Sequence, residues 1–252
     1  MHLNHWAARS VAAASLLIGS YAGAASILTD TFSYADGPLV AAGSPWASHS
    51  GTAGQVDVAS GVVNVSQTES EDVNTPFSAF TTGTVYAGLD FNLSVLPTGA
   101  GNYFAHFKDT TTGFRGRVFA TATGAAAGSY RLGIADATAT FVTIPVDLNL
   151  NSTHRFVVAT DAATGRSTLY LDSATETGGT VATDATTALA AGVSGFALRQ
   201  STASGAGMGV LTADNLSVAT TYAEALAVPE PTSLAAIALG AAALLRRRRG
   251  SR

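Results

Sequence analysis

The central part of the chain alternates apolar and polar residues with a period of two. The stretch from 89 to 95 is an example, with apolar Leu89, Phe91, Leu93 and Val95 separated by polar Asp90, Asn92 and Ser94. This pattern predicts a strand with one buried and one solvated face. It also occurs at 56–58, 63–65, 103–108 and 130–134. In 103–108 it predicts Tyr103, Ala105 and Phe107 on one face, and His106 on the other as a surface or sheet histidine.

A β-hairpin is predicted between positions 154 and 172. The segments His154–Thr160 and Ser167–Asp172 both alternate, and Asp161–Arg166 lies between them. Asp161 can cap its own backbone, and Gly165 accepts a positive φ, so this connection favours a turn.

The body from residue 26 to 227 is predicted to be a single all-β unit. Turn residues recur every 8 to 15 positions, and we find no repeat, heptad or linker. Helical periodicity is confined to the two ends of the chain. About 200 residues of short, regularly punctuated strands favour a two-sheet antiparallel sandwich or jelly roll.

The hairpin also resembles those of concanavalin A-like and laminin-G-like domains, where an Asp-x-x-Thr-Gly turn precedes a Leu-Tyr-Leu-Asp strand. Asp161–Gly165 and Leu169–Asp172 carry that resemblance. The opening segment Thr31–Gly37 and the closing segment Asp214–Val218 resemble the first and last strands of such domains. The resemblance implies a jelly roll in which these two strands pair and bring the ends of the body together.

The N-terminal 25 residues have the features of a secretory signal peptide. One basic residue, Arg9, precedes an apolar stretch from Val11 to about Tyr21, and the small residues Ala22-Gly23-Ala24 follow. The stretch is too short to span a bilayer. We therefore expect a signal helix, export through the Sec machinery, and cleavage after Ala24 or Ala25.

A second targeting segment is predicted at 228–252. Pro229-Glu230-Pro231 precede an apolar run of 14 residues, Thr232–Leu245, and then the basic cluster Arg246, Arg247, Arg248 and Arg249. A helix of that length measures about 21 Å, against about 30 Å for the hydrocarbon core, so a membrane span is marginal. The four arginines favour a cytoplasmic location for the C-terminal end of this segment.

This order of features resembles the PEP-CTERM sorting signal of exported bacterial proteins, a tail also called the ice-binding protein C-terminal domain. The resemblance implies that an exosortase recognises Pro229, Glu230 and Pro231, after the C-terminal helix has held the chain transiently in the inner membrane. It also implies a location in the cell envelope, at the surface or outside the cell. Whether the mature protein is released or surface-attached stays open.

Composition narrows the choice of partners. Only 12% of residues are charged, and cysteine is absent, which excludes disulfides and thiolate metal sites. Residues 26–227 contain 16 acidic and seven basic residues, a net charge of −9. A body this acidic lacks the positive surface that nucleic acids require.

No catalytic pattern stands out, so we expect a non-catalytic protein. Glu69 and Glu71 would share a strand face, as glycosidase carboxylates do, but Val73 and Asn74 stand where a third carboxylate is needed. An acidic solvated loop is the preferred interpretation of these two glutamates. The chain has no Gly-x-Ser-x-Gly and no His-Glu-x-x-His motif.

For ligands, the preferred candidates are Trp46 and His49, because an exposed aromatic ring beside polar groups suits a sugar. The alternative is that Trp46 covers one end of the sandwich. Calcium is a possible cofactor, but no Asp-x-Asp-x-Asp loop identifies its ligands, and the metal site stays unknown. Asp36, Asp109, Asp161 and Asp172 could bind it or cap turns. Arg115 and Arg117 could meet a ligand carboxylate or pair with Asp109 or Asp90.

These patterns predict an exported, exosortase-processed surface or extracellular-matrix protein associated with exopolysaccharide. A lectin-like glycan-binding module is the first alternative, and a glycoside hydrolase of jelly-roll type is the second.

Overall fold

A computed structural model describes residues 26–41, 43–184, 192–201 and 205–228. The predicted signal helix with Ala24 and Ala25 lies outside these residues. The Pro229–Pro231 motif, the C-terminal helix and Arg246–Arg249 also lie outside them.

The described residues form an all-β sandwich of two antiparallel sheets, which confirms the predicted fold class. One sheet has nine strands in the order β15-β14-β13-β7-β17-β5-β4-β2, and β1 pairs with β17 beside this path. Its strands are β1 (Leu28–Asp30), β2 (Gly37–Pro38), β4 (Asp57–Ala59), β5 (Val62–Ser66), β7 (Thr84–Val95), β13 (Thr153–Asp161), β14 (Ser167–Leu171), β15 (Thr180–Asp184) and β17 (Val210–Ala219).

The second sheet has eight strands in the order β11-β10-β9-β8-β16-β6-β3, and β12 pairs with β10. Its strands are β3 (Ala47–Ser50), β6 (Asp72–Phe80), β8 (Asn102–Asp109), β9 (Phe114–Thr121), β10 (Ser129–Ala135), β11 (Val142–Thr143), β12 (Leu148–Asn149) and β16 (Val193–Arg199). Neighbours such as β6, β16 and β8 are distant in sequence, because the chain passes repeatedly from one sheet to the other.

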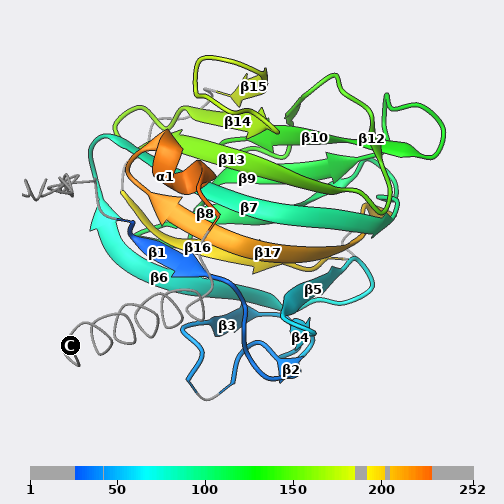
Figure 1. The fold of residues 1–252 in the computed structure, drawn as a ribbon, viewed down its shortest axis with the longest axis horizontal. Coiled ribbons are helices and arrows are strands. Elements are labelled where there is room, and N and C mark those ends of the chain that lie inside the picture. The colour runs from blue at the N-terminus through cyan, green and yellow to red at the C-terminus, as the bar shows by residue number, and fades with distance from the viewer. Residues whose placement is uncertain (1–25, 42, 185–191, 202–204, 229–252) are drawn as a thin grey trace, which may run out of the picture.

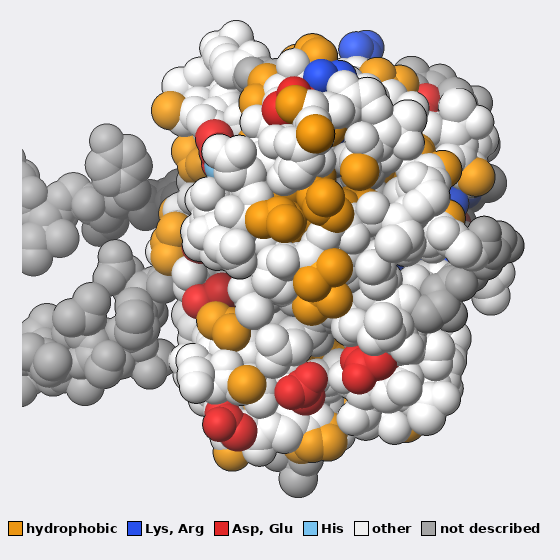
Figure 2. Space-filling view, turned by 90° about the vertical axis from the view of Figure 1, so that its right-hand side faces the viewer, with side chains coloured by type: hydrophobic (Ala, Val, Ile, Leu, Met, Phe, Trp, Pro, Cys, Tyr) orange, Lys and Arg blue, Asp and Glu red, His pale blue; other side chains and the backbone are white. Residues whose placement is uncertain are grey.

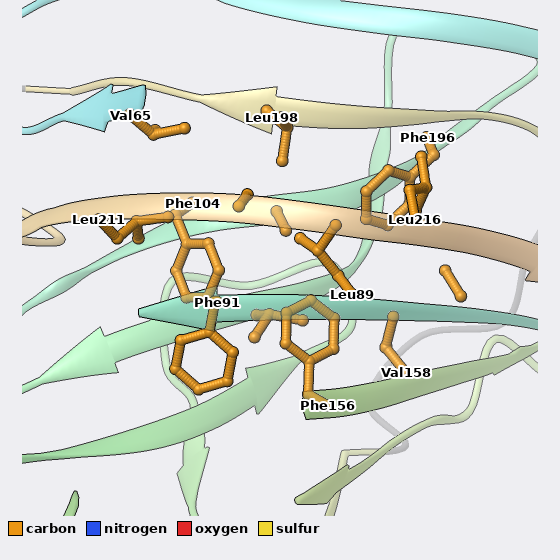
Figure 3. Packing of buried hydrophobic residues seen from close by; sticks show 14 of the residues in the cluster. Val65, Leu89, Phe91, Phe104, Phe156, Val158, Phe196, Leu198, Leu211 and Leu216 are labelled. Atoms are coloured by element: carbon orange, nitrogen blue, oxygen red, sulfur yellow. The ribbon is translucent and has the colours of Figure 1, made fainter. Parts of the chain in front are cut away.

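The core fills the space between the sheets, as the alternation predicted. Phe91 and Phe156 of the nine-stranded sheet meet Phe104 of the other sheet, with ring centroids 5.8 to 5.9 Å apart (Figure 3). All three side chains are buried. Burying a Phe side chain stabilises the fold by roughly 1.5–3 kcal/mol.

The hairpin predicted from sequence is present, and the first and last strands pair as expected, although the first strand is not the predicted segment. β13 and β14 form the expected hairpin, in which Asp161 caps the turn by accepting the N–H groups of Ala163 and Thr164. β1 pairs with the end of β17, so the first and last strands are neighbours. The first strand is Leu28–Asp30, and most of the expected Thr31–Gly37 segment is irregular.

The prediction for 103–108 was wrong in its faces. Phe104, Ala105 and Phe107 belong to the core between the sheets, whereas Tyr103 belongs to a separate cluster. The pairing of β8 with β9 shifts register twice, between Tyr103 and Ala105 and again between Ala105 and Phe107. Each irregularity displaces the alternation that a regular strand would follow.

A short helix, α1 (Tyr222–Leu226), lies across the outer face of the nine-stranded sheet, and the eight-stranded sheet forms the layer behind (Figure 1). Thr221 caps α1 by accepting the N–H of Glu224. Tyr222 and Ala225 pack on the sheet against a cluster that includes Tyr86, Val157 and Tyr170. No helix in the described part of the chain has the length and apolar character of a membrane span.

The end of the sandwich seen in Figure 2 carries few charges. Uncharged polar side chains and backbone cover most of this view, hydrophobic side chains are scattered through it, and acidic and basic side chains are few. The surface thus agrees with the low proportion of charged residues in the sequence.

Candidate functional site

Trp46 and His49 do not form the exposed sugar platform expected from the sequence. Trp46 is only 3% exposed, and its indole N–H donates to Asp30 Oδ2 at 2.8 Å. A buried ring has no free face on which a sugar could stack, so the structure corrects the expectation of an exposed Trp46. The alternative was that Trp46 covers one end of the sandwich, and the ring is indeed buried, beside Phe32 in the core cluster.

His49 lies instead at the edge of a larger group of side chains on the outer face of the eight-stranded sheet. We call this group the basic–aromatic face and define it by six residues: Tyr103, His106 and Phe114, with Arg117, Phe119 and Arg199. They come from β8, β9 and β16, which lie side by side in the sheet.

Tyr103 lies between two arginines at the centre of the basic–aromatic face. The guanidinium carbon of Arg199 is 4.2 Å from the centroid of its ring, and that of Arg117 is 5.3 Å away. These are cation–π distances, which hold the two guanidinium groups over one aromatic side chain. Burial raises the pKa of the Tyr103 hydroxyl, although both arginines act against that shift.

The arginines differ in their anionic partners. Arg199 is weakly paired with Asp72, at 3.7 Å, and donates to Asn102 Oδ1 at 3.0 Å. Arg117 makes no ion pair with a described carboxylate, and its guanidinium donates to the carbonyl oxygen of Thr138. Lys108, half-buried on β8, likewise has no described ion-pair partner. Lys108, Arg117 and Arg199 thus bring three positive charges to one side of a body with a net charge of −9, where Asp72 and Asp136 interact with the two arginines.

His106 is a sheet histidine on β8, one of the two alternatives expected, and it does not lie at the surface. It is completely buried, and its Nδ1–H donates to the carbonyl oxygen of Phe107 at 3.0 Å. Its ring packs on Phe114 with centroids 4.3 Å apart. Burial lowers the pKa of His106 to about 3 and that of half-buried His49 to about 4, so both are neutral at pH 7.

The four aspartates considered as calcium ligands or turn caps form hydrogen bonds within the protein. All four carboxylates proposed as turn caps or calcium ligands accept backbone N–H groups: Asp36 from Ser60, Asp109 from Thr111 and Gly113, Asp161 from Ala163 and Thr164, and Asp172 from Arg155. Asp172 also contacts His154 Nδ1 at 2.7 Å. Among the described residues, no group of three or more His, Cys, Asp or Glu side chains is arranged to hold a metal ion.

Glu71 is not part of a solvated loop, which corrects that interpretation. Its side chain is fully buried, and Oε2 accepts the N–H groups of Gln55 and Val56 at 2.7 Å. Glu69 lies in the preceding connection, before β6 begins. Arg115 pairs with Asp109 at 3.3 Å, as one alternative predicted, whereas Asp90 pairs with Arg155.

Sequence reasoning missed Tyr103, Phe119 and Arg199 as members of one site. They lie on three strands that are far apart in the sequence and adjacent only in the sheet. The distribution of basic residues could have indicated this face. Four of the seven basic residues of the body fall on β8, β9 and β16.

The end of the chain matches a known family model. Residues 227–249 match the PEP-CTERM protein-sorting motif. The chain carries a PEP-CTERM sorting signal. This motif implies processing by an exosortase and export to the cell surface, in agreement with the resemblance of Pro229–Pro231 and the segments that follow. The match begins at Ala227, immediately after α1 ends at Leu226.

Solved structures similar to the body include carbohydrate-binding proteins. One is the CBM2 module of the evolved Dit of Lactobacillus casei BL23 phage J-1, with 9% identity, a TM-score of 0.47 and coverage of 77% of this chain and 94% of that one. Another is the carbohydrate recognition domain of Emp47p, with 9% identity, a TM-score of 0.46, and coverage of 78% and 96%. A third is lectin II from Ulex europaeus, with 12% identity, a TM-score of 0.45, and coverage of 77% and 99%. No curated protein matches the sequence.

Proposed function

We propose that this protein is exported, processed by an exosortase at its PEP-CTERM tail, and placed in the extracellular matrix or at the cell surface, where it acts without catalysis and in association with exopolysaccharide. The observation that carries this proposal is the sorting motif at 227–249. The motif follows α1 directly, so removal of the tail beyond Ala227 leaves every described strand in place.

The non-catalytic part of the proposal is supported by the state of the acidic residues. Glu71 is buried and bonded to the backbone, and the nearby Asp72 accepts the hydroxyl of Ser50 at 2.7 Å. Retaining glycosidases need two carboxyl groups about 5–5.5 Å apart on either side of the scissile bond. Carboxylates engaged in fixed hydrogen bonds within the protein are poorly suited to that role.

Cell fractionation tests the location. Native protein should be recovered from the matrix or surface fraction in cells that have the exosortase, and from the membrane fraction in cells that lack it. A variant without residues 228–252 is the control, and it should reach neither the membrane nor the surface fraction. Recovery of the wild-type protein from the cytoplasm of normal cells would contradict the proposal.

Incubation with purified polysaccharides tests the absence of catalysis. We expect neither new reducing ends nor the unsaturated chain ends that a lyase would produce, with neutral and uronate-containing polymers alike. Turnover of any polymer would contradict the non-catalytic assignment and favour the hydrolase alternative or a lyase.

A second candidate function, glycan binding, is favoured by the basic–aromatic face. Arginine forms bidentate, charge-assisted hydrogen bonds with carboxylates, and aromatic side chains pack against sugar rings. Tyr103 and Arg117 are each only 9% exposed, so the side chains of this cluster that a ligand can reach are half-buried Arg199, Phe114 and Phe141. We infer that this face binds glycans that contain uronic acids.

Affinity electrophoresis tests this second function. The protein should be retarded in gels that contain polyuronate and should migrate freely in gels that contain a neutral glucan. Retardation should fall with added salt, since the interaction is between charges. Equal migration in both gels would contradict glycan binding by this face without affecting the sorting proposal.

A further inference from the structure

The end of the folded body is held in place by Arg155, a residue of β13. Its Nη2 donates to the carbonyl oxygens of Ala225 and Ala227 at 2.9 and 3.4 Å, at the C-terminal end of α1. A cation at this end of a helix satisfies carbonyls that have no partner within the helix. Because Ala227 is the first residue of the sorting motif, Arg155 holds the chain at the point where the tail begins.

Arg155 is itself fixed by neighbours on the same sheet. Its Nη1 donates to Asp90 Oδ1 at 2.7 Å and to the carbonyl oxygen of Asn215 at 3.1 Å. The amide of Asn215 in turn donates to Asp90 Oδ2 at 2.9 Å. The side chains of Arg155 and Asp90 are only 11% and 18% exposed, so the ion pair is largely shielded from water.

Gly88 of β7 allows α1 to approach the sheet. A Cβ on this residue would lie 1.9 Å from the carbonyl oxygen of Ala225 and 2.8 Å from Arg155 Nη2. The hydroxyl of Tyr222 adds a further hydrogen bond, to the carbonyl oxygen of Ser173 at 2.8 Å. We call Gly88, Asp90, Arg155, Ala225 and Ala227 the tail clamp.

The tail clamp leaves little free chain before the apolar run that starts at Thr232. From Ala227 to Thr232 there are five residues, which span at most about 18 Å when fully extended. A domain of about 200 residues has a radius of gyration of roughly 16 Å, and therefore a diameter of roughly 40 Å. The connection is thus much shorter than the body that it tethers.

The place of the tail clamp also decides which face lies near the tail. It sits on the outer face of the nine-stranded sheet, where α1 lies in Figure 1. The basic–aromatic face belongs to the other sheet, and its side chains form a cluster separate from the core between the sheets. Two stacked sheets are about 10 Å apart, and the outward side chains add to that thickness. A tether of 18 Å that starts on one side does not reach around the sandwich to the other.

We propose that the tail clamp orients the body on the membrane before the tail is cut: the outer face of the nine-stranded sheet is turned toward the lipid bilayer, and the basic–aromatic face is turned away from it. The body is tethered beside the lipid surface and need not bind it. This inference rests on the proposed function, because it requires the C-terminal apolar run to enter a membrane. Its consequence is that the half-buried residues of the basic–aromatic face, Phe114 and Arg199, can be reached by matrix polymers while the protein is still anchored.

Single reporters on the two faces test the orientation, and the absence of cysteine makes them simple to introduce. Ala223→Cys lies at an exposed position of α1, and Ser78→Cys lies at an exposed position of β6 in the other sheet. Each variant of the full-length protein is labelled with a fluorophore and reconstituted in phosphatidylcholine vesicles that contain a lipid with a nitroxide headgroup. We expect quenching at position 223 to be at least threefold that at position 78.

Two changes to the tether provide the controls. Insertion of 20 Gly and Ser residues between Ala227 and Val228 should equalise the two signals, because the body can then turn over. Arg155→Ala should act in the same direction, because release of α1 adds up to eight residues of free chain, or about 29 Å. Arg155→Lys, which keeps a cation, should retain part of the difference.

The possible outcomes separate this inference from the proposed function. If the protein floats with the vesicles and position 78 is quenched as strongly as position 223, the orientation is wrong and the sorting proposal is unaffected. If the protein does not float with the vesicles, the membrane-anchoring step is wrong, and the orientation fails with it.

Discussion

Gly88 and Ala225 approach each other so closely that no side chain fits between them. The contact joins a central strand of the nine-stranded sheet to the last helical turn before the sorting motif. Glycine is required here for space, and the carbonyl oxygen of Ala225 is then within reach of Arg155. The fold thus ends in a fixed element, from which the sorting tail starts.

Gly88→Ala is expected to displace α1 and leave the sandwich folded. Overpacking at this position should lower the free energy of unfolding by about 1–3 kcal/mol. It should also make the segment after β17 more sensitive to proteases, since α1 then loses its contacts. Urea denaturation and limited proteolysis with mass spectrometry measure the two effects. Ser94→Ala, at an exposed position of the same strand, should change neither; equal proteolysis in both variants would show that Gly88 does not control the docking of α1.

Arg117→Ala is expected to weaken polyuronate binding about tenfold, which corresponds to about 1.4 kcal/mol. Arg117 makes no ion pair with a described carboxylate, but it is only 9% exposed and interacts electrostatically with Asp136, so its loss removes positive charge beneath half-buried Arg199 and not a direct contact with the ligand. Arg166→Ala is the matched control, because Arg166 is exposed, unpaired among the described residues, and located in the β13–β14 turn of the other sheet. Equal loss of binding in the two variants would assign the effect to net charge.

Buried His106 predicts a loss of stability in acid. Its pKa is lowered by burial to about 3 in the folded protein, against about 6.5 when unfolded. The folded state therefore binds fewer protons, and its stability is complete above pH 6.5 and falls as the pH decreases toward 3. Between these limits His106 contributes a slope of about 1.4 kcal/mol per pH unit.

The substitution His106→Asn isolates this contribution. Urea denaturation between pH 7 and 4 should give a shallower decline for the variant than for the wild type. The pKa of His49 is also lowered, so His49 likewise makes the protein less stable as the pH falls. Burial raises the pKa of Asp136 to about 6, so Asp136 makes the protein more stable as the pH falls through the same range. Both remain in the variant, so identical slopes in the two proteins would contradict the assignment to His106.

Phe91→Ala should destabilise the protein by about 3–5 kcal/mol, because it opens a cavity where three rings meet. Val95→Ala on the same strand should cost much less, since Val95 is 45% exposed. The midpoint of chemical denaturation gives both values. A small effect at Phe91 would mean that the rings do not form the centre of the core.

The alternation of apolar residues predicted β4, β5, β7, β8, β10, β13 and β14, because facing the core is a property that each of these strands shows in its own sequence. The hairpin at 154–172 was predictable for the same reason, since Asp161 and Gly165 mark its turn. The pairing of β1 with β17 came instead from a resemblance to known domains.

The functional face was not predictable in the same way. Arg117, Tyr103 and Arg199 become neighbours only through the order of β9, β8 and β16. The pairing of β8 is also irregular at two points, and the neighbours Phe104 and Ala105 both lie in the core, which a strict alternation cannot anticipate. Trp46 shows a further limit, because local sequence does not reveal that Asp30 lies 2.8 Å from its indole nitrogen and helps to hold it inside.

The central claim is that an exosortase removes the tail of an exported body. The most direct test is the intact mass of the native protein, purified from cells with and without the exosortase. We predict a chain that lacks the first 24 or 25 residues in both cells, and that also lacks the residues after a cut near Pro229–Pro231 only where the enzyme is present. A C-terminus that extends to Arg252 in both cells would contradict the claim.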